Sequence, residues 1–251
     1  DAYEGAPTVV TGFMSTGVKA AAFAAFLRVF LSAFEPLRPD WVQMVVWIAV
    51  ATMVLGTAVG VVQSNVKRML AYSSIAHAGY LLVGLIAASN TGKAAVLFYL
   101  AVYAVANLGA FGVISAVSTR ERPKGDLADF TGLWYSQPVL ALLMGVFLLS
   151  LGGFPPLAGF LGKWYIFQAA VSEGYTGLAI IAILSSVVSV FFYLRIVVSM
   201  FMTTSSAEFE VPDFGRVGMA GLAIAAVLTF YLGVLPTRLI DLAAQSIQTI
   251  F

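Results

Sequence analysis

The sequence predicts an all-α, polytopic membrane protein with about seven transmembrane helices. Hydrophobic residues make up 61% of the 251 residues, and charged residues make up only 10%. Soluble domains are about 45–50% apolar and about 25% charged. Apolar runs of about 18 residues or more, the length that crosses a bilayer as a helix, recur along the whole chain. A soluble fold with a large core is therefore excluded.

Seven apolar runs define the predicted spans, which together form a single membrane domain over residues 1–251. The loop over residues 118–129 is charged and expected to be exposed, and no soluble domain is predicted. The tail over residues 237–251 has apolar residues at helical spacing, which predicts an interfacial helix. The predicted spans cover residues 8–34, 41–63, 69–88, 94–117, 138–170, 175–202 and 217–235.

Two of these spans are predicted to be broken. Residues 138–170 are too many for one straight crossing, and two crossings would need about 40 residues at about 1.5 Å each. The run Gly152-Gly153-Phe154-Pro155-Pro156 lies inside this span, and its prolines remove two backbone donors. The first span has a comparable group of small residues that ends at Gly17 and is followed by Lys19. Irregular backbone at membrane depth is tolerated only inside protein or beside a wet cavity, as at transporter binding sites.

Lys19 and Lys163 follow these two interruptions and are the main candidates for a functional role. A lysine at membrane depth costs about 2.5–3.5 kcal/mol, so it must find water, a partner or the neutral state. Lys19 lies about eleven residues into its span, roughly 16 Å from the start, which is too deep for easy snorkelling. The structural alternative for Lys163 is a cation that caps the freed carbonyl groups. Together the two lysines suggest a path for protons or cations.

His77 is the third candidate for the proton path. Histidine titrates near neutrality and suits a relay, although a lone membrane histidine is also often a packing residue. Neighbouring hydroxyl groups could hold water or merely satisfy helix carbonyl groups. Lys67 and Arg68 precede the third span and could simply anchor it. The other polar positions that could line water are Tyr72, Ser73, Ser74, Tyr103 and Asn107.

Metal and soluble-enzyme chemistry finds little support in this chain. Cysteine is absent, and the single histidine cannot build a zinc site alone. We find neither a phosphate-binding glycine loop nor a nucleophile paired with a base. The net charge of +1 argues against a nucleic-acid partner. No cofactor is predicted to bind this chain, so the free energy that drives transport must come from an ion gradient or a partner subunit.

The loop charges predict an orientation in the membrane. Seven crossings place the two chain ends on opposite sides. Basic residues favour the cytoplasmic side of short loops, which predicts a cytoplasmic start and a periplasmic end. The chain opens with Asp1 and has no signal segment, so a processed, split or truncated chain is expected. The starting side carries Lys67, Arg68, Arg120, Arg122, Lys124 and Arg216, against Arg38, Lys93 and Arg238 on the other side.

Three segments resemble the antiporter-like subunit N of proton-pumping NADH:quinone oxidoreductase, respiratory complex I. They are residues 1–8 with the following stretch to Lys19, residues 64–80 around His77, and residues 153–165 around Lys163. The second segment is specific for the wider antiporter-like group. The Tyr-Glu-Gly-Ala-Pro opening and the Gly-Lys-Trp-Tyr ending favour subunit N over its paralogues L and M, since M-type chains carry glutamate where Lys163 stands.

The resemblance covers the whole chain and implies helices eight to fourteen of a fourteen-helix subunit. It implies that Lys19 is the central lysine, that Lys163 belongs to the distal half-channel, and that His77 is a relay position. The family's glutamate of helix five and lysine of helix seven have no counterpart here. Another polypeptide or a longer chain would have to supply them.

The function implied by the resemblance is proton translocation in the membrane arm of complex I, in a bacterial inner membrane. Redox chemistry with NADH, FMN, iron–sulfur clusters and quinone is expected in partner subunits, which include antiporter-like and small membrane subunits. Three alternatives remain open. They are a cation/proton antiporter or a membrane-bound hydrogenase subunit, a structural membrane subunit that does not pump, and a channel-forming domain unrelated to redox.

Overall fold

A computed structural model describes residues 2–118, 125–203 and 214–250, and it confirms the all-α class. Within these ranges six helices are long and apolar enough to cross a membrane. A shorter apolar helix, α8, joins them. Arg120, Arg122 and Lys124, which contributed to the predicted orientation, lie outside the described residues.

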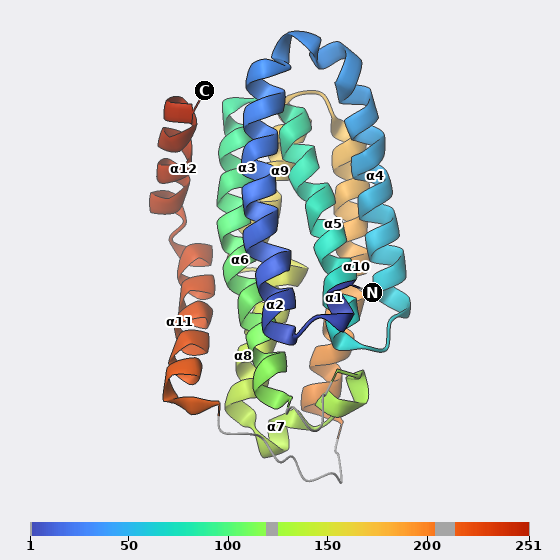
Figure 1. The fold of residues 1–251 in the computed structure, drawn as a ribbon, viewed down its shortest axis with the longest axis vertical. Coiled ribbons are helices and arrows are strands. Elements are labelled where there is room, and N and C mark those ends of the chain that lie inside the picture. The colour runs from blue at the N-terminus through green and yellow to red at the C-terminus, as the bar shows by residue number, and fades with distance from the viewer. Residues whose placement is uncertain (1, 119–124, 204–213, 251) are drawn as a thin grey trace.

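The helices run up and down in one bundle (Figure 1). After the short α1 (Ala2–Gly5), the first long helix covers Thr8–Ala33 and contains α2 (Thr8–Phe13) and α3 (Lys19–Arg28). The next helices are α4 (Arg38–Val62), α5 (Val66–Ala87), α6 (Asn90–Val117), α7 (Leu133–Ser136) and α8 (Pro138–Gly152). The last four are α9 (Ala158–Ser172), α10 (Thr176–Met202), α11 (Gly215–Val234) and α12 (Thr237–Ile250).

Local sequence signals explain where several helices begin and end. Asn65 caps α5 by accepting a hydrogen bond from the Arg68 amide at 3.0 Å, and Ser89 caps α6 in the same way at 3.2 Å. Helix α8 ends at Gly153, whose φ of 88° lies in the left-handed region that favours glycine. The Pro155–Pro156 segment then separates α8 from α9, where the sequence predicted the second break.

The first predicted break takes a milder form. The helix over Thr8–Ala33 continues without interruption, but Met14–Val18 form a π-helical turn directly before Lys19. Ser15 and Thr16 donate hydrogen bonds to the Gly12 carbonyl at 2.9 and 2.8 Å, which ties their hydroxyl groups to the turn itself. The small residues therefore widen one turn of the helix, and they do not end it.

The tail forms a helix, as predicted. We expected it to lie in the membrane interface, and the structure packs α12 along the N-terminal part of α6 (Figure 1). Its buried residues Ala243 and Ile247 contact Ala94 of α6, and Leu239 and Ile240 pack near Phe98. The apolar face that suggested an interfacial helix is thus covered by α6.

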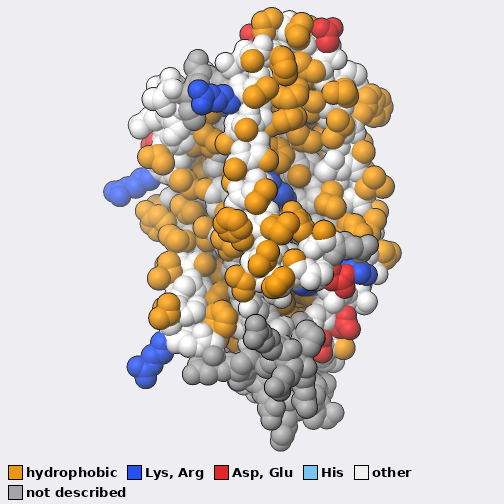
Figure 2. Space-filling view, in the orientation of Figure 1, with side chains coloured by type: hydrophobic (Ala, Val, Ile, Leu, Met, Phe, Trp, Pro, Cys, Tyr) orange, Lys and Arg blue, Asp and Glu red, His pale blue; other side chains and the backbone are white. Residues whose placement is uncertain are grey.

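The outer surfaces of the bundle are apolar, as expected for helices in lipid. Hydrophobic side chains cover most of the face seen in Figure 2. On α4, Trp47 is 66% exposed, and on α10, Val187 is 62% exposed. Large apolar surfaces of this kind mark contact with a membrane or a partner.

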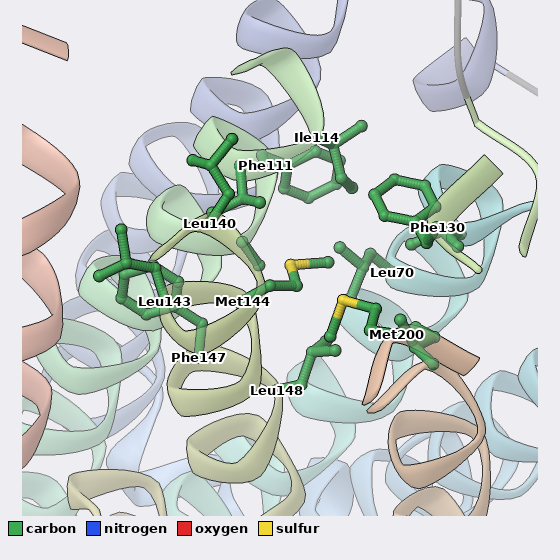
Figure 3. Packing of buried hydrophobic residues seen from close by; sticks show 14 of the residues in the cluster. Leu70, Phe111, Ile114, Phe130, Leu140, Leu143, Met144, Phe147, Leu148 and Met200 are labelled. Atoms are coloured by element: carbon green, nitrogen blue, oxygen red, sulfur yellow. The ribbon is translucent and has the colours of Figure 1, made fainter. Parts of the chain in front are cut away.

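The interior contains two apolar clusters, one toward each end of the bundle. The first joins the lower part of α5 and α6 with α8 and the end of α10 (Figure 3). The second joins α3, α4 and the upper part of α5 with the start of α6, α9 and the start of α10. Helices α5, α6 and α10 contribute to both clusters and change from one to the other at a similar level. The residues at that change of cluster are polar, so we call them the polar layer: Ser73, Ser74, His77, Lys163, Ser185, Ser186 and Ser189.

Candidate functional site

Lys163 fills the gap that the α8–α9 break leaves in the backbone. Its Nζ donates to the carbonyl oxygens of Leu151 and Gly152 at 2.9 and 3.0 Å, and to Ser186 Oγ at 2.8 Å. Helix ends leave carbonyl groups without partners, and at membrane depth such groups need an internal donor. The side chain is only 4% exposed. Lys163 therefore both closes the break and places an amine inside the bundle.

Lys19 contacts the polar layer from the first long helix, which covers Thr8–Ala33. Its Nζ donates to both the carbonyl oxygen and the hydroxyl group of Ser74 on α5. The same nitrogen lies 4.9 Å from the ring centroid of Tyr103, close enough for a cation–π contact. The π-helical turn precedes Lys19 directly, so it sets the direction in which the side chain leaves the helix.

His77 lies on the same helix as Ser74, one turn further on, and is 2% exposed. Its Nδ1 is hydrogen-bonded to the hydroxyl of Tyr99 on α6, and its Nε2 to that of Tyr193 on α10 at 3.0 Å. The Tyr193 hydroxyl is also bonded to Ser73 Oγ. The histidine is thus held by groups from two other helices, α6 and α10.

Several buried polar atoms in this region lack a hydrogen-bond partner among the described residues. They include the hydroxyl oxygens of Thr57, Tyr80 and Tyr103 and Oδ1 of Asn107. Asn107 does use its amide nitrogen, which donates to Ser15 Oγ at 2.7 Å. Unpaired buried polar atoms are rare in proteins and commonly mark ordered water. These atoms are suited to hold water along the polar layer.

Two spaces adjoin the site. A groove of about 480 Å³ opens beside Lys163 and Ser186, with aromatic walls that include Phe160, Trp164 and Phe167. A second, narrow space separates His77, Tyr99 and Tyr103 from Ser150 and Gly159, and it is too tight for a water molecule as the side chains stand. Lys163 is therefore close to a groove that opens on the outside of the bundle, whereas the space between His77 and the α8–α9 break is closed.

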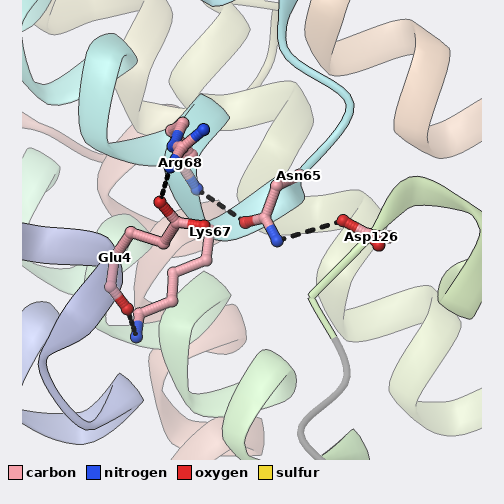
Figure 4. Close-up of polar contacts among 5 residues, drawn as sticks. All are labelled: Glu4, Asn65, Lys67, Arg68 and Asp126. Atoms are coloured by element: carbon pink, nitrogen blue, oxygen red, sulfur yellow. Dashed lines mark hydrogen bonds and ion pairs between the residues drawn. The ribbon is translucent and has the colours of Figure 1, made fainter. Parts of the chain in front are cut away.

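Lys67 lies away from the polar layer. Its Nζ donates to the carbonyl oxygens of Glu4 and Ala6, the first at 2.6 Å, and so ties α1 to the start of α5 (Figure 4). Arg68 forms an ion pair with the Glu4 carboxylate, and both side chains are partly exposed. We call this group the N-terminal clamp. Asn65 extends it by donating to Asp126 at 3.2 Å.

The structure brings most of the predicted polar residues together, with some exceptions. Lys19, Ser73, Ser74, His77, Tyr103 and Lys163 lie in or beside the polar layer. The hydroxyl of Tyr72 makes no hydrogen bond within the described ranges. Gly17 belongs to the π-helical turn, and Gly152, Gly153, Pro155 and Pro156 belong to the α8–α9 break.

Sequence reasoning missed Tyr99, Tyr193 and Ser186, which bind His77 and Lys163 directly. A signal was present. Tyr99 and Tyr103 are four residues apart on α6, which places both on one helix face. Ser186, Ser189 and Tyr193 have the same periodic spacing on the apolar helix α10. A polar stripe on an apolar helix could have identified these positions.

The broken helix, the buried lysines and the all-helical bundle define a membrane protein of the antiporter-like class. The family model described as "NADH:quinone oxidoreductase/Mrp antiporter, TM" matches residues 1–191. The chain belongs to this family.

Known relatives agree with this assignment. The chain is 45% identical over 250 residues to NADH-quinone oxidoreductase subunit N of Trichlorobacter lovleyi, covering 100% of this chain and 51% of that one. It is 46% identical over 251 residues to subunit N 1 of Herpetosiphon aurantiacus, covering 100% of this chain and 51% of the relative. The chain therefore spans about half the length of the curated relatives it matches.

Solved structures show the same fold. A chain of respiratory complex I from Thermus thermophilus superimposes with a TM-score of 0.81 at 37% identity, covering 95% of this chain and 52% of that chain. A chain of the Mrp complex from Dietzia superimposes with a TM-score of 0.85 at 23% identity, covering 97% and 53%. At that identity the second likeness concerns the fold alone.

Proposed function

We propose that this chain forms half of a proton-translocating membrane subunit of NADH:quinone oxidoreductase. The observation that carries the proposal is the polar layer between the two apolar clusters, which contains His77 and Lys163 and which Lys19 contacts through Ser74. The relatives of this chain that are named subunit N, and the complex I chain that shares its fold, support this proposal.

The proton path begins at Lys19, passes beside Ser74 and His77, and ends at Lys163. Each amine binds only neutral acceptors among the described residues, so no fixed carboxylate holds its charge. Burial disfavours a charge that has no such partner, which makes proton release feasible. The groove beside Lys163 offers the exit.

The driving force comes from outside the chain. Redox chemistry with NADH, FMN, iron–sulfur clusters and quinone takes place in partner subunits, and none of these groups binds here. The partners are other membrane-arm subunits, both antiporter-like and small. Moving one charge against 100 mV costs about 2.3 kcal/mol, which a change in the charge state of a buried lysine can supply. The setting is a bacterial inner membrane, with the N-terminal end cytoplasmic and the C-terminal end periplasmic.

The test is to replace each lysine by alanine in the assembled complex and to measure protons pumped per electron. We expect Lys19→Ala and Lys163→Ala to lower this ratio while the complex still assembles. Arg216→Ala, at an exposed position at the start of α11, is the matched control. An unchanged ratio in both lysine variants would support a structural subunit, and redox-independent Na⁺ or K⁺ exchange would support an antiporter.

A further inference from the structure

Among the described residues Lys163 has three hydrogen-bond partners, which differ in kind. Its Nζ bonds to the carbonyl oxygens of Leu151 and Gly152 and to the hydroxyl of Ser186. An ammonium group has three N–H donors and no acceptor, so these three partners use all of its donors. The charged amine is therefore fully bonded within this chain, and no N–H is left to donate to water.

Only one of these three partners can bond the neutral amine in the opposite sense. A neutral amine has two N–H groups and one lone pair. Its two N–H groups can stay on the carbonyl oxygens of Leu151 and Gly152, which only accept hydrogen bonds. A serine hydroxyl both donates and accepts, so Ser186 can turn and donate to the lone pair. All three hydrogen bonds of Lys163 thus survive the loss of one proton, provided that the proton is lost on the Ser186 side.

We infer that Ser186 relays the proton by which Lys163 is charged and discharged. On discharge one Nζ–H bond breaks and its proton joins Ser186 Oγ, while the proton that Ser186 carried passes to a water molecule. The electron pair of the broken N–H bond stays on the nitrogen, Ser186 ends neutral, and the positive charge leaves as protonated water. The reverse sequence charges the amine. The inference rests on the proposed proton path and names the side chain through which that path leaves Lys163.

The surroundings of Ser186 are suited to that water molecule. Ser186 lines the groove of about 480 Å³ beside Lys163. The hydroxyl of Tyr80 lies beside those of Thr57 and Ser186 but makes no direct hydrogen bond, and the Thr57 hydroxyl also has no partner in the part of the chain that the structure describes. Buried hydroxyl groups of this kind commonly mark ordered water. Ser186 is therefore the residue at which the amine, the groove and a site suited to water meet.

Three substitutions of Ser186 separate a relay from a residue that merely holds the amine. Holding the ammonium needs only an acceptor oxygen, whereas a relay needs an oxygen that also carries a proton. Ser186→Thr keeps the hydroxyl, and Ser186→Val has the shape of threonine without it. Ser186→Asn supplies an acceptor oxygen that carries no proton. The groove beside Ser186 leaves room for these larger side chains.

The test measures protons pumped per electron by the assembled complex, with Lys163→Ala measured alongside. We expect Ser186→Thr to keep the ratio of the unaltered complex, and Ser186→Val and Ser186→Asn both to fall to the ratio of Lys163→Ala. A holding role predicts instead that Ser186→Asn pumps like Ser186→Thr, and that result would overturn the inference. A Ser186→Thr variant as impaired as Ser186→Val would also overturn it, because the threonine hydroxyl should restore the relay.

Ser199→Val is the matched control for the loss of a hydroxyl group from α10. Ser199 Oγ is hydrogen-bonded to the Thr131 hydroxyl at 3.0 Å and is not a partner of Lys163. We expect this variant to pump like the unaltered complex. A fall equal to that of Ser186→Val would assign the effect to the packing of α10 and contradict the relay.

The two lysine and serine results also separate this inference from the proposed function. If Lys163→Ala pumps normally, the proton path is refuted and the relay role is refuted with it. If Lys163→Ala is impaired while Ser186→Val and Ser186→Asn pump normally, the path stands and only the role of Ser186 is refuted.

Discussion

The ammonium of Lys163 reaches back across the α8–α9 break and donates to the Gly152 carbonyl at 3.0 Å. The residue with a proposed transport role therefore also stabilises the irregular backbone. Stability and transport can be separated only with variants that change one of them.

Lys163→Met should destabilise the break as well as abolish transport. Methionine keeps most of the side-chain volume but leaves the Leu151 and Gly152 carbonyl groups without their donor. We expect a cost of about 1–3 kcal/mol for each carbonyl that stays unpaired. Thermal unfolding of the purified complex, followed by a fluorescent label on this chain, measures it. An unfolding midpoint equal to that of the unaltered chain would show that water replaces the amine at no cost.

Gly153→Ala and Gly174→Ala form a matched pair. Both glycines have positive φ, 88° and 83°, so alanine adds about 1–2 kcal/mol of backbone strain at either position. A Cβ at Gly153 would lie 3.2 Å from Lys163 Cδ, whereas one at Gly174 would have nothing within 4 Å. We expect both variants to lose similar stability but only Gly153→Ala to lower protons pumped per electron. Equal pumping by the two variants would show that displacing Lys163 has no effect.

Gly159→Ala should separate the two halves of the broken span. A Cβ there would lie 1.8 Å from the Ser150 carbonyl oxygen, so the backbone of α8 or α9 must move. Overpacking of this kind costs about 1–3 kcal/mol or more. Gly221→Ala is the control, because its Cβ meets nothing within 4 Å and alanine raises helix propensity by about 1 kcal/mol. The yield of assembled complex should fall for the first variant and hold or rise for the second.

The N-terminal clamp should depend more on Lys67 than on the ion pair beside it. Lys67→Met leaves two carbonyl oxygens of the α1 segment without their donor, those of Glu4 and Ala6. Glu4→Gln removes a partly exposed ion pair with Arg68, which is worth about 0–1 kcal/mol. Hydrogen exchange over residues 2–11 should therefore rise more in Lys67→Met than in Glu4→Gln. The reverse order would assign the clamp to the ion pair.

The helices and the second break could be predicted from the sequence, because long apolar runs and a Gly-Gly-Phe-Pro-Pro segment are compatible with few other structures in a membrane. It was less informative about the first span, since Ser15 and Gly17 are compatible with either a break or a widened turn. Tyr99 and Tyr193 bind His77 from positions 22 and 116 residues away. Such contacts depend on how helices α5, α6 and α10 are rotated against one another, and periodicity within one helix does not determine that rotation.

The apolar face of the tail shows a similar limit. Its periodicity indicated correctly that one side of α12 is covered, but the sequence did not show whether lipid headgroups or another helix covers it. The structure places Ala243 and Ile247 against α6. An amphipathic pattern therefore identifies the face that is covered, and tertiary packing decides what covers it.

The π-helical turn over Met14–Val18 has one further consequence. One residue more than an α-turn rotates everything after it by about 100°, so chain length, as much as residue identity, determines where Lys19 faces. Converting that π-helical turn into a regular α-helical turn would rotate the Lys19 amine away from Ser74 without unwinding any part of the helix. The chain thus contains a local winding change by which one amine could be connected or disconnected while its neighbours stay in place.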